Sequence, residues 1–328
     1  MTETGFRSSS VSDPSLHHRD HGTRWFLCLL AVLWIFFYSV WLRFPYLRSG
    51  ASIVYSAKDT QERRGVVFPA DVPAASRLIV FGNSKVLTGF LPDLFDRQTG
   101  VYSANMGKPE ESRFVSDLAL LAARGQAPRD VVVTLPWATE APPPDDSRVM
   151  DTLFPFRKLP RDLVLFGMLA RERGGVPALY RYGENAVQSM QQNRGWYFIE
   201  GQSHYPGDRL PDSFHLGTDR PDVIDDPAFL PRGPEFERLN RLASRYSMRV
   251  FLVPSYHRIG ELGPSPDYAA SVARRMAGFP RFTVIGPNYF LLASRYFSDP
   301  VHLNPEGAAV YTTRLAGILA PAVSRPRE

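Results

Sequence analysis

Two short motifs near opposite ends of the chain carry side chains suited to nucleophilic chemistry. Gly82-Asn83-Ser84 follows an apolar run, and Asp299 precedes His302 by three residues near the C-terminus. A serine hydroxyl becomes a good nucleophile when an imidazole removes its proton, and that imidazole needs an acid to fix its tautomer. An Asp three residues before a His in a loop can fold back to the ring's Nδ1. The two motifs together predict Ser84 as nucleophile, His302 as base and Asp299 as orienting acid.

Each motif alone also has a plain structural interpretation. Gly-Asn-Ser is common turn chemistry, and a serine in this place is more often a helix cap than a nucleophile. The two motifs become informative because they occur at opposite ends of one α/β pattern. Their meeting in the fold is therefore the expectation on which the site depends.

The elements expected to position these motifs are those of a parallel α/β sheet. Five short β-rich runs predict strands, at residues 77–81, 101–105, 130–135, 248–253 and 282–285. Helical spacing occurs between them, over residues 110–124 and 161–173, and a final helix is predicted after an Asn304 cap. A serine just past the carboxyl end of the first strand lies where open α/β sheets bind ligands.

The tail, the stalk, the domain and an insert within the domain are assigned as follows. Residues 1–24 are polar and Ser-rich and predict a disordered tail, and residues 43–75 predict an extended stalk. Residues 76–328 are expected to form the catalytic domain. The long stretch at about 138–232 is interpreted as a lid or substrate-binding insert, because an insertion of this length is usually functional.

Residues 25–42 form an 18-residue run without charge, bracketed by Arg24 and Arg43. A helix of this length spans roughly 27 Å, close to the hydrocarbon thickness of a bilayer. The pattern predicts a single transmembrane helix. A cleaved signal peptide is the alternative, but its apolar core is usually shorter, about 7–15 residues. Lys and Arg are balanced on the two sides, so charge gives no orientation.

Composition excludes several function classes. The net charge of +5 comes without a dense Lys/Arg block, which argues against a nucleic-acid partner. The single cysteine, Cys28, lies in the apolar run, so the domain has no disulfide, no thiolate nucleophile and no Cys-based zinc site. His204 and His215 show no ligand spacing. Neither a metal nor another cofactor is expected.

The two motifs resemble the first and last sequence blocks of the SGNH/GDSL hydrolase superfamily. The longer strings GNSKVLTGFLPD, SANMG, VVVTLPW and DPVHLN are similar to a membrane-tethered branch of it. That branch includes exopolysaccharide O-acetyltransferases of the alginate acetylation type and the D-alanyl transfer proteins of teichoic acids. The resemblance covers about residues 76–137 and 247–320. It implies a three-layer sandwich with a parallel five-stranded sheet, SGNH or flavodoxin-like.

The resemblance also implies residue roles. Gly107 matches the second block, whose glycine amide helps to form an oxyanion hole. The third block usually supplies an Asn side chain, but here it reads Leu135-Pro136-Trp137. Asn105 or Asn83 is offered as the substitute for that missing amide.

Further residues are pocket candidates. Trp137, Tyr256 and His257 are expected to line a substrate pocket, although ordinary packing or loop positions are the alternative for each. Trp137 and Trp196 could stack on sugar rings. Lys85 either approaches the nucleophile or is an exposed turn lysine.

The expected protein is a membrane-anchored serine esterase or O-acyltransferase that acetylates or deacetylates a cell-surface polysaccharide through an acyl-Ser84 intermediate. The resemblance implies an inner-membrane, single-pass protein with an extracytoplasmic, periplasmic domain and a membrane-bound O-acyltransferase partner. Transfer and hydrolysis stay open, because the choice depends on the exclusion of water. A non-catalytic carbohydrate-binding or scaffold protein of a polysaccharide modification or export complex is the alternative.

Overall fold

The structure of the protein is a computed structural model that describes residues 14–43, 54, 57–58, 67–108, 114–135, 159–198, 205–214, 231, 233–260 and 268–324. The helices are α1 (Pro14–Arg43), α4 (Ser84–Gly89), α5 (Pro92–Thr99), α6 (Phe114–Ala123), α8 (Leu159–Glu172), α9 (Val176–Gln192), α10 (Gly233–Arg245), α11 (Tyr268–Met276) and α12 (Pro305–Val323). The strands are β1 (Arg77–Phe81), β2 (Tyr102–Asn105), β3 (Asp130–Leu135), β4 (Arg249–Pro254), β5 (Tyr256–Arg258), β6 (Phe282–Val284) and β7 (Phe290–Leu292). Short 3-10 turns occur at η1 (Ala74–Ser76), η3 (Pro206–Asp208) and η5 (Ser294–Tyr296).

Five strands form one parallel sheet in the order β2-β1-β3-β4-β6, which confirms the predicted α/β class and sheet. The chain moves from β1 outward to β2 and then returns across β1 to β3. A switch point forms where the connections from two neighbouring strands run in opposite directions. Ligands bind there, at the carboxyl ends of the strands. In this sheet the switch point lies between β1 and β3.

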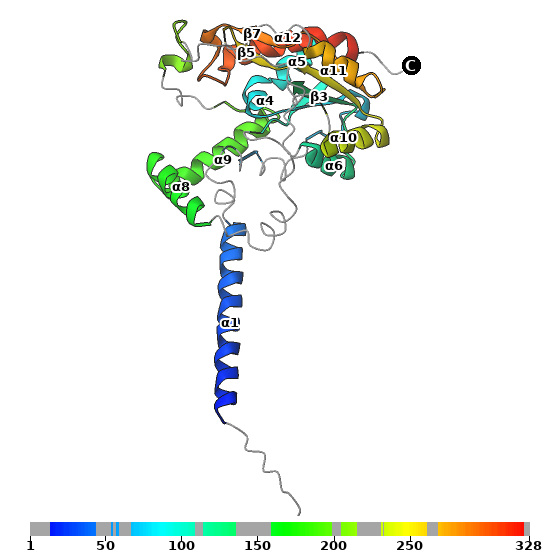
Figure 1. Ribbon diagram of the computed structural model, residues 1–328. Helices are drawn as coiled ribbons and strands as arrows, with labels where there is room; N and C mark the ends of the chain where they lie inside the picture. Colours follow the sequence, from blue (N-terminus) through cyan, green and yellow to red (C-terminus); the bar gives the residue numbers. More distant parts are fainter. Residues whose placement is uncertain are drawn as a thin grey trace, which may run out of the picture. The chain divides into compact units, whose positions relative to one another are not determined.

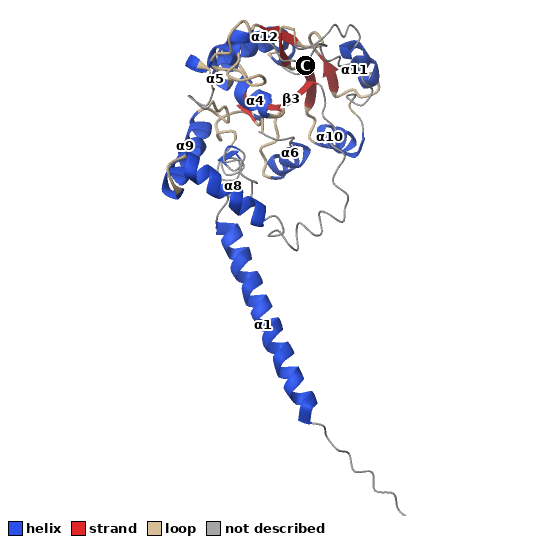
Figure 2. Cartoon of the chain, turned by 60° about the vertical axis from the view of Figure 1, so that its left-hand side comes forward, coloured by secondary structure: helices blue, strands red, loops and turns tan. Residues whose placement is uncertain are grey.

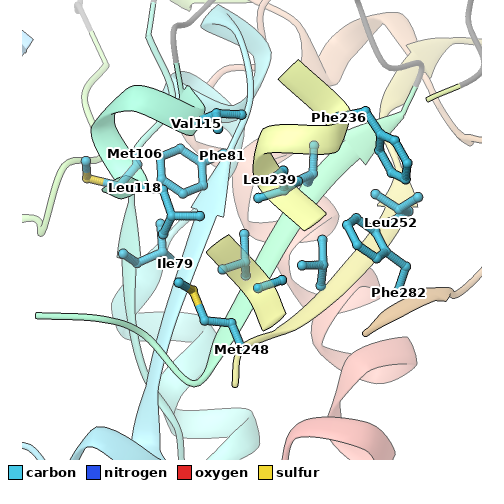
Figure 3. Packing of buried hydrophobic residues seen from close by; sticks show 14 of the residues in the cluster. Ile79, Phe81, Met106, Val115, Leu118, Phe236, Leu239, Met248, Leu252 and Phe282 are labelled. Carbon is cyan, nitrogen blue, oxygen red and sulfur yellow. The ribbon is translucent and has the colours of Figure 1, made fainter. Parts of the chain in front are cut away.

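The sheet buries apolar side chains on both faces, as parallel strands do. Ile79 and Phe81 pack in a core with α6, α10 and α11. Figure 3 shows the part of this core that α6 and α10 contribute. Leu78 and Val80 point the other way and pack with residues of α5 and α12. Figures 1 and 2 accordingly show α5 and α12 on one face of the sheet and α6 and α10 on the other.

A second, two-stranded sheet pairs β5 with β7 and was not predicted from the sequence. Each of these strands has three residues, too few for a period-two pattern to stand out. Helix α9 was also not predicted. It begins after Gly175, with a proline in its first turn, and buries one apolar side.

The folded domain begins earlier than expected. The predicted stalk, residues 43–75, includes Val67 and Phe68, which are buried in the core with α6. Ala57 and Lys58 are also buried. The end of the segment is therefore part of the domain, because its apolar side chains fill space beside the sheet.

Helix α1 begins at Pro14, so residues 14–24, expected in the tail, are helical. Its stretch Gly22–Ser39 is long and apolar enough to cross a membrane, and no other helix among the described residues is. A signal sequence near an N-terminus meets the same test. The apolar side chains of this stretch are exposed rather than packed in a core.

The chain divides into two compact units, residues 1–51 with 144–167 and residues 52–143 with 168–328. The second unit contains the sheet and both apolar cores. The described parts of the predicted insert are α8, α9 and the segments 193–198 and 205–214.

Candidate active site

Ser84 is the first residue of α4, directly after the turn that follows β1. A Cβ on Gly82 would overlap the side chains of Val86 and Thr134, so the turn requires glycine. The Asn83 side-chain oxygen accepts a hydrogen bond from the Lys85 N–H at 3.0 Å and caps the helix. The apolar strand, the glycine turn and the cap together hold Ser84 at the carboxyl edge of the sheet, beside the switch point.

The structure brings the three predicted side chains of the two motifs together. The Ser84 Oγ lies 2.8 Å from His302 Nε2, and His302 Nδ1 lies 2.7 Å from Asp299 Oδ2. With the ring proton on Nδ1, the imidazole donates to the carboxylate and accepts from the serine hydroxyl. A nucleophile, a base and an orienting acid within hydrogen-bond reach are the geometry that acyl transfer requires.

The loop between η5 and α12 fixes the Asp299 carboxylate and the His302 ring. Asp299 Oδ1 accepts from the backbone N–H groups of Val301 and His302, both at 2.7 Å. The Ser298 N–H donates to the His302 carbonyl at 2.9 Å, and Phe297 and Leu303 form an antiparallel bridge. These bonds close a tight loop, so both side chains are positioned by local backbone geometry.

The same loop sets the charge state of Asp299. Partial burial raises the pKa of its carboxyl, but the hydrogen bond and charge of His302 and the two backbone N–H groups outweigh burial. The net result is a pKa below the ordinary value for aspartate. Asp299 is therefore ionised at neutral pH, as an orienting acid must be.

The structure does not support the two predicted oxyanion-hole donors, Gly107 and Asn105. Asn105 is fully buried, and its amide nitrogen donates to the carbonyls of Val86 and Phe90 at 2.8 Å and of Leu87 at 3.2 Å. The Gly107 N–H donates to the Asn105 side-chain oxygen at 2.9 Å. Both donors are engaged within the fold: the Asn105 amide bonds the α4 region, and the Gly107 N–H holds the Asn105 side chain. Gly107 is required for packing, because a Cβ there would overlap the backbone of Leu87.

Two other donors lie beside the nucleophile. Ser84 is the first residue of α4, and its N–H has no acceptor four residues earlier within the helix. The amide nitrogen of Asn83 makes no hydrogen bond to any residue that the structure describes, because only the oxygen of that side chain serves as the cap. The sequence had offered Asn83 as one of two substitutes for the missing amide.

The pocket prediction is wrong for Tyr256. Its side chain is fully buried, its hydroxyl donates to the Lys85 carbonyl at 3.1 Å, and its ring packs against Phe297 and Tyr311. The side chain packs against α4 inside the fold and does not line an open surface. The sequence could not show this, because Tyr256 follows a strand at the same sheet edge as the other candidates.

His257 and Lys85 lie side by side. The Lys85 ammonium donates to the Tyr256 carbonyl at 3.1 Å and lies 3.4 Å from His257 Nδ1. His257 is buried, so the prediction that it lines an open pocket is also wrong, and its ring contacts Tyr289. The two side chains connect α4 to β5, which makes Lys85 a partly buried contact rather than an exposed turn lysine.

The two remaining aromatic candidates, Trp137 and Trp196, have different outcomes. Trp137 lies outside the described residues. The Trp196 indole N–H donates to the Thr88 carbonyl of α4 at 2.9 Å, so this ring joins the insert to the helix that carries Ser84. Within the described residues, no group of three or more His, Cys, Asp or Glu side chains is placed to hold a metal ion.

Comparison of the chain with protein-family models, with curated proteins and with solved structures finds no match.

Proposed function

We propose that the protein is a membrane-anchored SGNH-type serine esterase or O-acyltransferase that works through an acyl-Ser84 intermediate. The observation that carries the proposal is the continuous hydrogen-bonded series from the Ser84 Oγ through the His302 ring to Asp299. The order of the five strands, the location of Ser84 at the switch point and helices on both sheet faces support an SGNH or flavodoxin-like three-layer sandwich.

The reaction has two halves. In the first, the Ser84 Oγ attacks the acyl carbonyl while His302 Nε2 takes the hydroxyl proton. The tetrahedral intermediate collapses, the bond to the leaving oxygen breaks, and His302 returns the proton to that oxygen. In the second half, His302 takes a proton from water or a sugar hydroxyl, whose oxygen attacks the acyl-Ser84 ester. The serine leaves with the proton, and the enzyme is restored.

The negative charge on the intermediate needs donors that are in place before the reaction. The Ser84 N–H and the Asn83 side-chain amide serve this purpose in the proposal, because the amides of Gly107 and Asn105 are engaged elsewhere. A single pre-aimed donor of this kind contributes about 3 kcal/mol to the stability of the transition state. Asn83 thus takes the part of the amide that is missing at Leu135-Pro136-Trp137.

The substrate and setting follow from the family resemblance and from α1. The resemblance to exopolysaccharide O-acetyltransferases favours an acetyl group and a cell-surface polysaccharide. The apolar stretch of α1 supports attachment to the inner membrane by a single helix. An extracytoplasmic, periplasmic domain and a membrane-bound O-acyltransferase partner complete the proposal.

A second candidate is a non-catalytic carbohydrate-binding or scaffold protein of a polysaccharide modification or export complex. The observation that favours it is that both predicted oxyanion donors already make hydrogen bonds within the fold. A fluorophosphonate probe separates the two candidates, because it reacts with an activated serine and not with an inert one. Absence of labelling at Ser84 in the folded protein would favour the scaffold.

The test of the leading proposal is Ser84→Ala. The variant is expected to lose hydrolysis of p-nitrophenyl acetate by at least about 10³-fold, and to lose fluorophosphonate labelling, because no other group takes over the nucleophile's part. Ser271→Ala is the matched control, since the hydroxyl of this partly exposed serine of α11 makes a hydrogen bond only with Arg274 among the described residues. Turnover by Ser84→Ala at the wild-type rate would refute the assignment.

A further inference from the structure

Two segments of the long insert lie against the two halves of the candidate site. Residues 193–198 contact α4, which carries Ser84, and residues 205–214 contact the loop that carries Asp299 and His302. Both segments belong to the compact unit that contains the sheet. An insert that contacted one half would be ordinary packing, whereas an insert that holds both halves can set their separation.

The first segment holds the C-terminal end of α4. The last carbonyls of a helix have no partner within the helix, so a helix as short as α4 depends on donors from outside. The Trp196 indole N–H donates to the Thr88 carbonyl at 2.9 Å. Leu87 of α4 shares a buried apolar cluster with Met190 of α9, the helix that leads into this segment. The insert therefore supplies a hydrogen bond and an apolar contact to the helix that begins at Ser84.

The backbone of the first segment is also joined to the end of β2. The Asn105 N–H donates to the Arg194 carbonyl at 2.9 Å. The buried Lys58 ammonium donates to the Gly195 carbonyl at 3.1 Å and to the Asn105 carbonyl. Gly195 has a φ of 95°, and a Cβ there would overlap the Asn105 carbonyl oxygen. The segment is therefore fixed to the strand end from which the Asn105 amide bonds α4.

The second segment holds the loop of Asp299 and His302. The Leu210 N–H donates to the Phe297 carbonyl at 2.9 Å, beside the bridge between Phe297 and Leu303 that closes the loop. The Leu210 side chain is fully buried and shares an apolar core with both of these residues. One backbone hydrogen bond and one buried side chain thus fix this segment to both ends of the loop.

The start of α12 provides a further contact with the second segment. The Asn304 amide donates to the Asp208 carbonyl at 3.2 Å and to the Arg295 carbonyl at 2.8 Å, while the Asn304 oxygen caps α12. Asn304 follows His302 by two residues. Together with the bond to the Phe297 carbonyl, this contact ties the insert to the backbone on both sides of the imidazole.

The proposed reaction depends on an accurate separation of the two halves. Proton transfer between Ser84 and His302 uses the 2.8 Å contact of Oγ with Nε2, and a misplacement of about 1 Å can slow a reaction by about 10²-fold. Tyr256 is one connection between the halves, since its hydroxyl bonds the Lys85 carbonyl and its ring packs on Phe297. The insert is a second connection.

We propose that the insert positions the nucleophile relative to its base, with Trp196 and Leu210 as positioning residues. The inference rests on the proposed function, because it concerns the hydrogen bond between Ser84 and His302. Both residues act through the site residues and not on the acyl group. Since both halves of the reaction use the same imidazole, a loss of positioning lowers kcat and leaves KM unchanged.

The first test is Trp196→Phe in the full chain, which keeps an aromatic ring and removes the N–H that bonds the Thr88 carbonyl. The kcat for p-nitrophenyl acetate is expected to fall about tenfold at unchanged KM. Asn193→Ala is the matched control, because it also removes a side-chain donor to a backbone carbonyl at 2.9 Å, but that carbonyl belongs to Ser189 of α9. Its kcat should equal that of the wild type. A wild-type kcat for Trp196→Phe, or a change in KM alone, overturns the role of Trp196.

The second test compares Leu210→Ala with Leu319→Ala. Both leucines are fully buried in the same core, but Leu319 lies about 20 Å along α12 from its first residue. Both variants are expected to lower the Tm, and only Leu210→Ala should lower kcat about tenfold. Equal kcat values for the two variants overturn the role of Leu210. The valine variants at the same two positions repeat the comparison if the alanine variants do not fold.

The third test separates positioning from stability and from substrate binding. In a His302→Ala background, Leu210→Ala should have no further effect on the residual turnover, because the loop then has no imidazole to position. The same loss of turnover in both backgrounds overturns the inference. Wild-type turnover by His302→Ala itself would instead refute the proposed function, so the two failures are distinguishable.

Discussion

At the scale of single residues, three side chains from two distant motifs meet within hydrogen-bond distance at the end of β1. Their neighbours differ in kind. The Asn83 side-chain oxygen caps α4, whereas the Asn105 amide makes buried hydrogen bonds inside the fold. The two asparagines are therefore expected to respond differently to substitution, one in rate and the other in stability.

Asn83→Ala is expected to lower kcat for p-nitrophenyl acetate by about 10²–10³-fold, because a donor to the oxyanion is lost. It should also cost about 1 kcal/mol of folding free energy through the lost cap. Asn83→Asp separates the two effects, since a carboxylate keeps the cap but cannot donate. Kinetics and thermal unfolding of both variants check the prediction, and full activity of Asn83→Asp would contradict it.

Asp299→Asn is expected to lower kcat by roughly 10³–10⁴-fold, because an amide no longer fixes the His302 tautomer. The substitution also changes how stability depends on pH. The folded pKa of Asp299 lies below its ordinary value, so its carboxylate stabilises the fold above about pH 4, and this contribution is lost as the pH falls through the folded pKa. The stability gap between wild type and variant should therefore be wide at neutral pH and should close in acid. Calorimetry of both proteins across pH measures it, and a constant gap would count against the pKa shift.

At the scale of elements, α4 depends on partners from three separate segments. The Asn105 amide at the end of β2 donates to the Val86 carbonyl. The Tyr256 hydroxyl on β5 donates to the Lys85 carbonyl, and the Trp196 indole after α9 donates to the Thr88 carbonyl. A helix of six residues has little stability of its own. Its position, and with it the position of Ser84, is set by these contacts.

Asn105→Ala is expected to destabilise the protein by roughly 2–4 kcal/mol, because three carbonyls of the α4 region lose their buried donor. Chemical denaturation midpoints measure the loss. Asn193→Ala is the control, since the side chain of this partly buried asparagine bonds only Ser189 among the described residues. An equal effect of the two substitutions would contradict the structural role of Asn105.

At the scale of the whole molecule, the sheet, both apolar cores and the three site residues belong to the unit of residues 52–143 and 168–328. Helix α1 belongs to the other unit and contributes nothing to either core. Burial of apolar surface is what stabilises a domain of this size, so the sheet-bearing unit should not need α1 in order to fold.

A chain that begins at Ser52 is therefore expected to fold and to label with fluorophosphonate at an unchanged rate. Labelling kinetics provide the measurement. Failure of the truncated chain to fold would mean that residues 1–51 contribute to the domain.

The sequence by itself determined the parallel α/β class, the apolar stretch within α1 and the pairing of Ser84 with Asp299 and His302 as candidates. These depend on local patterns: uniform apolar runs, an uncharged stretch, and a loop in which Asp can bond backbone and ring three residues on. The boundaries of the five main strands differ from the predicted ones by a residue at most.

Only the tertiary structure decided which polar groups beside Ser84 are available. The Asn105 amide bonds a carbonyl of α4, and the Gly107 N–H bonds the Asn105 side chain. The buried Tyr256 of β5 bonds another carbonyl of the same helix. A hydrogen bond between distant segments has no signature in either segment, since the same asparagine would serve equally well as a donor to substrate. The burial of Lys58 and Phe68, outside the predicted domain, was hidden for the same reason.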